Sequence, residues 1–274
     1  MSASMNTGAA TARGPAPAAG TTPKIRVRGL KKVFGANRVL NGVDLDVMPG
    51  ESVVLVGRSG SGKSVLGKCI LGLMPPDEGT IEIDGKDVTR MPRREREATY
   101  AQFGALFQNG ALFDSLLIWQ NISFALVQAR GWPQDKAKKL AIERLRDVGM
   151  DAGVGDLFPA ELSGGMQKRA AFARAIAASP EVVVLDDPTA GLDPIVTTAI
   201  SKLIQKIIRE AHATALSISQ DLTVIHNIAD RVAMLYEGKI IWTGPAATVE
   251  KSGDTFVEQF INGRRQGPIP SDVV

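Results

Sequence analysis

The sequence predicts an α/β fold with parallel strands and helices at its core, an antiparallel β region at its N-terminal end and an inserted α-helical lobe. Three observations support this prediction. A short β-branched apolar run, Glu51–Val56, leads into a glycine-rich loop and then into a helical pattern. Residues 92–178 have mainly helical patterns, and residues 179–245 return to alternating strands and helices. We therefore expect one domain over residues 24–250, with the lobe at about 92–178.

Each element has a local justification. The helix predicted over Val65–Leu73 stops at Pro75-Pro76, because proline cannot continue a helix. Apolar runs rich in β-branched residues are typical of buried strands. Further strands are predicted at Ile81–Ile83, Val182–Leu185, Thr214–Ser219, Val232–Tyr236 and Lys239–Trp242. The helices of the lobe are predicted at Arg93–Thr99, Gln120–Gln128, Gln134–Val148 and Gly165–Ala178.

The glycine-rich loop has the features of a phosphate-binding site. Its sequence, GRSGSGKS from Gly57 to Ser64, fits the pattern G-x-x-x-x-G-K-[ST] without a mismatch. Glycines let several backbone N–H groups converge on one anion, and the following helix adds its N-terminal partial charge. We expect Lys63 to reach the β- and γ-phosphates and the Ser64 hydroxyl to ligate Mg²⁺. The predicted nucleotide contacts are Gly57, Arg58, Ser59, Gly60, Ser61, Gly62, Lys63, Ser64 and Val65. This pattern indicates a P-loop NTPase core; a glycine-rich turn with an incidental lysine is the alternative.

A carboxylate completes the predicted Mg²⁺ site. Asp186 follows the strand Val182–Leu185, and ligands of α/β folds bind beyond the carboxyl ends of such strands. We expect Asp186 to hold the Mg²⁺ shell opposite Ser64. Because Asp187-Pro188 is also a turn signal, a simple strand-ending turn residue is the alternative.

A second anion site is predicted at the run LSGGMQ, Leu162–Gln167. Ser163 is a good N-cap for the helix that follows, and Gly164 and Gly165 leave backbone N–H groups open. One chain cannot easily place two such sites on one γ-phosphate. Taken alone, the run also fits an ordinary loop-to-helix cap.

Together and in this order, these motifs resemble the ATP-binding subunits of ABC transporters over nearly all of residues 24–265. The resemblance implies ATP and Mg²⁺ as ligands, Phe34 stacked on adenine, and Gln108 sensing the γ-phosphate and Mg²⁺ and touching a transmembrane partner. In that family the signature of one subunit covers the phosphate loop of the other, so ATP joins two chains. The signature residues implied to contact ATP are Ser163, Gly164, Gly165 and Met166. Phe34 as a core residue and Gln108 as a solvated loop residue remain alternatives.

Two residues depart from the family pattern at catalytic positions. The carboxylate after the Mg²⁺ aspartate is Asp187 instead of glutamate, and the residue after the strand Thr214–Ser219 is Gln220 instead of histidine. With Lys63 and Gln108, these residues form the predicted catalytic set. A shorter carboxylate and an uncharged amide favour slow hydrolysis and a long-lived dimer. Mutual compensation with normal turnover is the other interpretation.

The composition of the chain limits which partners, compartment and membrane association we expect. The chain has 274 residues and a net charge of +3, too small to indicate a nucleic-acid partner but suited to a peripheral protein at an anionic membrane surface. A single cysteine excludes an internal disulfide and fits a reducing cytoplasm. Residues 1–23 are expected to form a disordered tail without a secretory signal. No run of eighteen apolar residues occurs, so we expect no membrane span.

Two segments point to a subfamily. The run FQNGALFDS, Phe107–Ser115, with Asn121 after it, and the run from Phe256 to Ile269 look like the ATPases of Mla-type phospholipid transporters. That group implies a homodimer at the cytoplasmic face of the inner membrane, a permease dimer, an MCE-domain lipid-binding protein and often a STAS-domain regulator. It also implies that the extension 251–274 contacts the partner ATPase subunit. Part of the apolar stretch from Leu106 to Asn121 is predicted to form an exposed socket for a helix of the permease. The alternative is that Leu112, Phe113 and Leu116 pack inside the lobe.

Three other functions remain open. One is an ABC transporter for another substrate, such as an amino acid or a lipoprotein. A soluble ABC ATPase for translation or DNA repair is disfavoured, because the chain has one module and no heptads. An assembly module that binds ATP and hydrolyses it slowly is compatible with Asp187 and Gln220.

Overall fold

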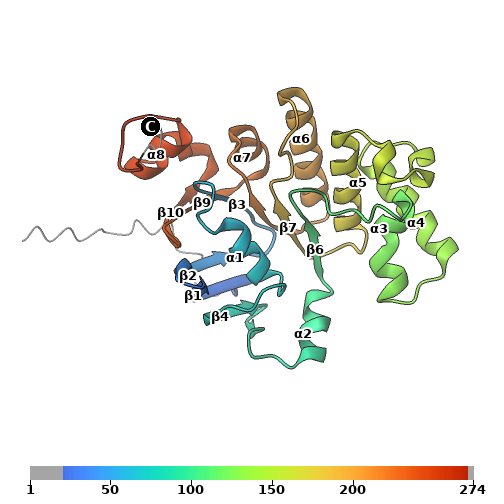
Figure 1. Ribbon diagram of the computed structural model, residues 1–274, viewed down its shortest axis with the longest axis horizontal. Coiled ribbons are helices and arrows are strands. Elements are labelled where there is room, and N and C mark those ends of the chain that lie inside the picture. The colour runs from blue at the N-terminus through green and yellow to red at the C-terminus, as the bar shows by residue number, and fades with distance from the viewer. Residues whose placement is uncertain (1–20, 271–274) are drawn as a thin grey trace, which may run out of the picture.

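The structure, a computed structural model, describes residues 21–270, so the predicted tail lies almost entirely outside the described residues. Two sheets form its centre (Figure 1). The first has four strands in the order β2-β1-β4-β5 and is antiparallel throughout, which confirms the antiparallel β region predicted near the N-terminus. Its strands are β1 (Ile25–Phe34), β2 (Asn37–Val47), β4 (Glu78–Ile83) and β5 (Lys86–Asp87).

The second sheet has six strands in the order β10-β9-β3-β8-β7-β6. Five of them run parallel, and only β10 pairs antiparallel, with β9. Every residue of β3 is buried, as expected for a parallel strand covered on both faces. The strands are β3 (Ser52–Val56), β6 (Phe103–Leu106), β7 (Val182–Asp186), β8 (Thr214–Ile218), β9 (Arg231–Tyr236) and β10 (Lys239–Pro245).

The strand β6 was not predicted, because its four residues lie in a region with helical patterns on both sides. It pairs in parallel with β7 and so belongs to the core sheet. The residue Gly104 explains how it fits there: a Cβ at this position would lie 2.0 Å from the carbonyl oxygen of Ala175. Only glycine allows the strand to approach the neighbouring helix this closely.

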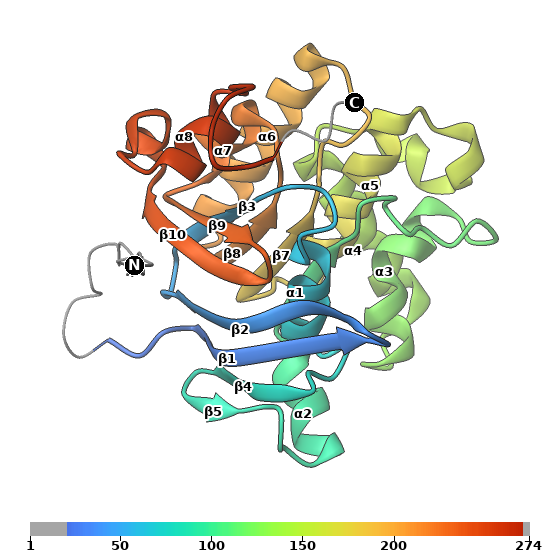
Figure 2. The ribbon, with the colours of Figure 1, turned by 60° about the vertical axis from the view of Figure 1, so that its left-hand side comes forward.

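Helices cover both faces of the six-stranded sheet. The helix α1 (Lys63–Ile70) lies between the two sheets, where Leu66 and Ile70 share a buried apolar cluster with strands of both (Figure 2). On the other face α6 (Pro194–Glu210) and α7 (Leu222–Ile228) contribute Ile204 and Val224 to a second cluster. This arrangement is the α/β core that the sequence predicts.

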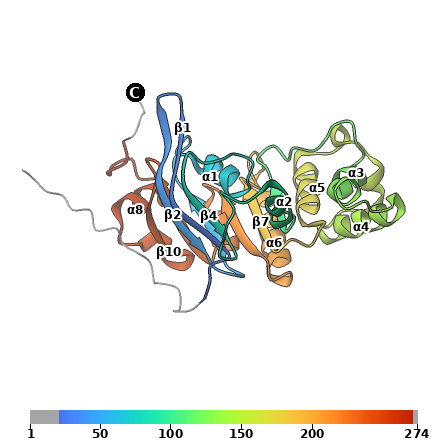
Figure 3. The same cartoon turned by 90° about the horizontal axis from the view of Figure 1, so that it is seen from below.

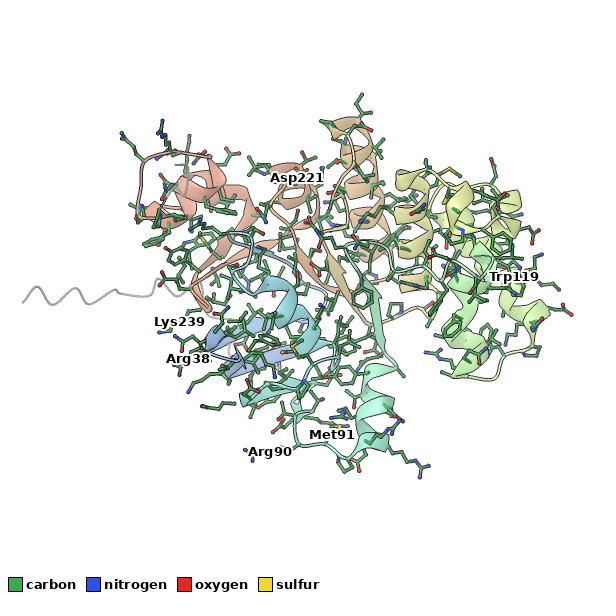
Figure 4. The ribbon with its side chains drawn as sticks, in the orientation of Figure 1. Arg38, Arg90, Met91, Trp119, Asp221 and Lys239 are labelled. Carbon is green, nitrogen blue, oxygen red and sulfur yellow. The ribbon has the colours of Figure 1, made fainter. Side chains whose placement is uncertain are left out.

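The lobe extends to one side of the sheets, as Figures 1 and 3 show. Three helices contact one another there and share a core that includes Trp119, which Figure 4 labels. None of the described helices is long and apolar enough to cross a bilayer. The elements of the lobe are α3 (Ile118–Gln128), α4 (Gln134–Asp147), η1 (Ala152–Asp156), η2 (Pro159–Glu161) and α5 (Gly164–Ile176). A further helix, α2 (Arg93–Tyr100), precedes β6.

The C-terminal extension, as far as residue 270, folds back on the core of its own chain. After η3 (Ala246–Lys251), the helix α8 (Thr255–Ile261) buries Val257 and Ile261 in a cluster with residues of β3, β9 and β10 (Figure 2). The ring of Phe256 lies 5.1 Å from that of Tyr236. The predicted contact of this extension with a second subunit stays a prediction.

Candidate nucleotide-binding site

The phosphate loop lies where the sequence predicts it, between the end of β3 and the start of α1. Gly57, Gly60 and Gly62 have φ values of 147°, 77° and 101°, a region that favours glycine. A Cβ at Gly57 would lie 2.2 Å from the carbonyl oxygen of Leu235 on the neighbouring strand. The glycines of the motif therefore meet two separate requirements, an unusual backbone and a close approach of two main chains.

The side chain of Lys63 is buried and bonds to the backbone of this loop. Its Nζ donates hydrogen bonds to the carbonyl oxygens of Gly57 and Arg58 at 2.7 and 2.8 Å, and the side chain is only 7% exposed. Burial lowers the pKa of the Lys63 ammonium. The buried hydroxyl of Ser61 in the same loop has no hydrogen-bond partner within the described part of the chain. A buried cation and an unsatisfied hydroxyl in one glycine loop fit an anionic ligand such as a triphosphate.

Two of the three predicted Mg²⁺ ligands, Ser64 and Asp186, come from elements 122 residues apart and meet. The third, Gln108, follows β6 and is exposed, and its contact with Mg²⁺ stays a prediction. Ser64 begins the first turn of α1, and Asp186 ends β7. The Ser64 hydroxyl donates a hydrogen bond of 3.1 Å to Oδ1 of Asp186. A hydroxyl and a carboxylate oxygen beside a phosphate loop are the hard donors that Mg²⁺ takes, with phosphates and water completing its shell. The residues present therefore fit the ion.

Asp187 lies beside this pair in a strained backbone position. Its φ is 52°, its N–H donates to the carbonyl of Ile218 at 2.9 Å, and the residue is half-buried. Burial, then the charge of Asp186, raises the pKa of the Asp187 carboxyl, against the positive charges of Lys168 and Lys63. A carboxylate with a raised pKa next to the Mg²⁺ pair is suited to accept a proton from an attacking water.

The two predicted glutamines lie at the rim. Gln108 follows β6 and Gln220 follows β8, and both side chains are exposed. Because β6, β7 and β8 are parallel, these residues and Asp186 leave the sheet at the same edge. The Ser219 hydroxyl accepts the N–H of Asp221 at 3.1 Å, and Asp221, labelled in Figure 4, caps α7. The turn that carries Gln220 is therefore held on both sides.

Phe34 is also exposed, which rules out the alternative that it is a core residue. It ends β1 with 46% of its surface accessible, and the ammonium of Lys32 lies 5.7 Å from the centre of its ring. An exposed aromatic ring near a cation can stack on a base. Its contact with adenine stays a prediction.

The signature run forms a helix start, as predicted. Ser163 has an extended backbone, and its hydroxyl accepts the N–H of Met166 at 3.4 Å. The helix α5 begins at Gly164, one residue earlier than predicted, and a Cβ on Gly164 would meet no atom within 4 Å. Ser163 and Gly164 are exposed. In Figures 1 and 3 this helix belongs to the lobe and lies apart from α1, so the two anion sites do not face one another within one chain.

Comparison with known proteins decides the family. The family model described as "ABC transporter" matches residues 40–190, which include the phosphate loop, the signature and Asp186. This chain belongs to the ABC transporter family. It is an ATPase subunit of that family, which binds ATP and hydrolyses it.

Relatives of this ABC ATPase cover most of its length. It is 39% identical to "Probable ribonucleotide transport ATP-binding protein mkl" of Mycobacterium leprae, over 89% of this chain and 70% of the relative. It is 34% identical to the intermembrane phospholipid transport system ATP-binding protein MlaF of Haemophilus influenzae, over 89% of this chain and 92% of the relative. It is 36% identical to the methionine import ATP-binding protein MetN of Leifsonia xyli, over 91% of this chain and 74% of the relative.

A solved structure agrees in fold and indicates an assembly. The dimeric post-hydrolysis state of the ATP-binding cassette MJ0796, bound to ADP and phosphate, matches with a TM-score of 0.74 and 28% identity. The match covers 81% of this chain and 98% of that one. Related cassettes therefore occur as dimers.

Sequence reasoning missed two cations of this ABC ATPase, Lys168 and Arg174 on α5. Lys168 is only 8% exposed and donates a hydrogen bond to the backbone carbonyl of Gln108. Arg174 donates to the carbonyls of Gly110 at 2.8 Å and Ala111 at 2.6 Å. Charged residues on a helix usually face water, and nothing in the sequence marks these two as different.

Proposed function

We propose that two copies of this chain bind two ATP molecules at a shared interface and energise phospholipid transport between the inner and outer membranes. The alignment with MlaF carries this proposal, because it spans 92% of a relative whose name states intermembrane phospholipid transport. The resemblance of the segment Phe107–Ser115 to Mla-type ATPases supports it independently of overall identity.

The geometry indicates how ATP would join two chains. The phosphate loop with Lys63 and the exposed helix start at Ser163 are both suited to bind an anion, and they lie apart within one chain. A second copy, related by a two-fold axis, would place its Ser163 on the γ-phosphate held by the first. Both sites are then formed by residues of two chains, as expected for a self-complementary interface.

The residues of one chain would divide the chemistry among them. Lys63 would bind the β- and γ-phosphates, and Ser64 and Asp186 would hold Mg²⁺, which when bound would supply positive charge beside the phosphates. Asp187 accepts a proton from the attacking water, while Gln108 and Gln220 donate or accept hydrogen bonds at the γ-phosphate and water. Gln220 carries no charge and relays no proton, so Asp187 is the base of this set.

A surface on the lobe is suited to a permease. Asn121 is completely buried, and its side-chain amide bonds the N–H of Phe113 at 2.7 Å and the carbonyls of Phe113, Leu116 and Leu117 at 3.0–3.2 Å. This holds the loop so that Phe113 stays 45% exposed, with its ring 4.7 Å from that of Phe124. The alternative of internal packing holds only for part of this segment, since Leu112 packs on the lobe core.

In this proposal the chain lies at the cytoplasmic face of the inner membrane as a peripheral subunit, which is what the Mla-type resemblance implies. There the surface around Phe113 would receive a helix of the permease dimer. An MCE-domain lipid-binding protein and a STAS-domain regulator would complete the assembly. No nucleic-acid partner is part of this proposal.

The test is affinity purification of the tagged chain from solubilised membranes of its own organism, with mass spectrometry of proteins and lipids. We expect a permease, an MCE-domain protein and glycerophospholipids. Phe113→Ala should lower recovery of the permease, whereas Leu73→Ala should not, although Leu73 on another surface is 61% exposed. Recovery of a soluble amino-acid-binding protein, with no MCE-domain protein, would contradict the lipid assignment.

A second substrate class is supported by a specific observation. The MetN relative of Leifsonia xyli is named a methionine import protein. The purification above separates the two, because an importer of methionine would co-purify with a binding protein for that amino acid. A Lys63→Ala variant assayed for lipid flux separates a transporter from an assembly module that hydrolyses ATP slowly.

A further inference from the structure

The segment that carries Gln108 lies along the signature helix. Between β6 and the start of the lobe the chain turns, with the N–H of Gly110 donating to the carbonyl of Phe107 at 2.7 Å. A Cβ at Gly110 would lie 3.5 Å from the Cβ of Ala171 and 4.0 Å from the carbonyl oxygen of Gln167, both on α5. Residues 107–111, which we call the Gln108 segment, are therefore in van der Waals contact with this helix.

Two cations of α5 fasten the two ends of this segment. Lys168 donates to the carbonyl of Gln108, and Arg174, almost two turns later, donates to the carbonyls of Gly110 and Ala111. Hydrogen bonds from charged donors are stronger than neutral ones. The segment is thus held by three such bonds in addition to its contact with Ala171.

The burial of Lys168 shows that this contact is not incidental. A lysine is seldom fully buried, and this one is 8% exposed. Burial lowers the pKa of the Lys168 ammonium, and attraction to the carboxylates of Asp187 and Asp186 opposes this shift. The ammonium that α5 supplies to the Gln108 segment is therefore also within electrostatic reach of the carboxylates of the ATP site.

We propose that Lys168 and Arg174 are positioning residues for ATP hydrolysis, which fasten the Gln108 segment to the signature helix so that Gln108 and Ser163 move together. This rests on the proposed sharing of each ATP by two chains. Gln108 faces the nucleotide on its own phosphate loop, whereas Ser163 faces the nucleotide on the loop of the second copy. The contacts of Lys168 and Arg174 with the Gln108 segment therefore connect the two ATP sites of a dimer through one helix, α5.

The test uses the purified full-length chain and needs neither permease nor lipid. Lys168→Met and Lys168→Arg are compared with Arg169→Met, because Arg169 on the same helix donates to the carbonyl of Gly149, outside the segment. We expect Lys168→Met to lower kcat by about ten- to a hundredfold, the effect of a misplaced catalytic group. Binding of a fluorescent ATP analogue should change by less than about twofold, and the Hill coefficient for ATP should fall toward 1.

Lys168→Arg should restore most of kcat, and Arg169→Met should behave like the parent chain. Hydrogen exchange gives a second measurement that does not depend on activity, because peptides that cover 107–111 should exchange faster in Lys168→Met and in Arg174→Met. An unchanged kcat with unchanged exchange would overturn the proposal, and so would an equal loss in Arg169→Met. Failure of the lipid or permease assignment would leave this result unaffected.

Discussion

The glycine at the start of the phosphate loop gives the sharpest prediction about how the site is built. In a Gly57→Ala variant the new Cβ would lie 2.2 Å from the carbonyl oxygen of Leu235, a buried main-chain atom of β9. Ordinary contact begins at 3.4 Å, so the loop and the strand would have to separate by about 1.2 Å, the difference between the two distances. The oxygen belongs to the sheet and cannot turn away as a side chain does.

Gly60 supplies the matched control. It lies in the same loop and has a φ of 77°, but a Cβ there would meet no atom within 4 Å. Both alanine variants carry the cost of a positive φ, about 1–2 kcal/mol. Only Gly57→Ala adds the cost of forcing atoms apart in a packed region, about 1–3 kcal/mol. The difference between the variants therefore contains the steric contribution together with the larger backbone cost of φ 147° at residue 57 than of φ 77° at residue 60.

The assay is urea unfolding without nucleotide, followed by titration with a fluorescent ATP analogue. We expect Gly57→Ala to have a free energy of unfolding lower than that of Gly60→Ala by about 1–3 kcal/mol. Its affinity for ATP should fall by about tenfold or more relative to the parent chain, because displaced loop amides lose charge-assisted hydrogen bonds. Equal stability of the two variants would show that a Cβ at residue 57 does not push the loop away from β9.

Three further predictions concern the catalytic carboxylate, the cysteine and a buried lysine. Asp187→Glu combined with Gln220→His should raise the steady-state ATPase rate of the isolated chain, because a longer carboxylate reaches the attacking water more easily; equal rates would contradict slow hydrolysis. Burial raises the pKa of the Cys69 thiol to about 11, so labelling with iodoacetamide at pH 8 should be slow until urea unfolds the chain, and fast native labelling would show an exposed thiol. Lys24 bonds Asp84 and Glu181 at 2.9 and 2.6 Å, and these hydrogen bonds raise its pKa despite the opposing effect of burial. Between neutral pH and pH 10.5 the stabilisation by Lys24 is therefore complete, and it is lost as the pH rises through the raised pKa. On the alkaline side, the difference in unfolding free energy between the parent chain and Lys24→Met should therefore narrow only above pH 10.5.

The parts of the site that could be predicted are those encoded by consecutive residues. The phosphate loop needs a strand, glycines and a helix in order, and the sequence shows all three between Glu51 and Leu73. The N-cap at Ser163 needs only local backbone geometry. The meeting of Ser64 with Asp186 was predictable as well, since strand ends of a parallel sheet share one edge.

The remaining features depend on contacts that form only in the folded chain. The strand β6 is short and contains Gly104, and it exists because it pairs with β7 and approaches Ala175 closely. Lys168 resembles any solvated helical lysine until the Gln108 segment covers it. Val257 and Ile261 stand four residues apart in the sequence, which is one helical turn, but the sequence could not show that the core of its own chain covers them.

In the proposed dimer, each ATP is bound by the phosphate loop of one chain and the signature of another. The most direct test of this arrangement is the mass in solution of an Asp187→Asn variant with ATP and Mg²⁺, by light scattering after size-exclusion chromatography. We predict twice the monomer mass with ATP, the monomer mass without it, and a monomer that still binds ATP when Ser163→Arg is added. A nucleotide-loaded variant that stays monomeric, or a dimer unaffected by Ser163→Arg, would contradict the account.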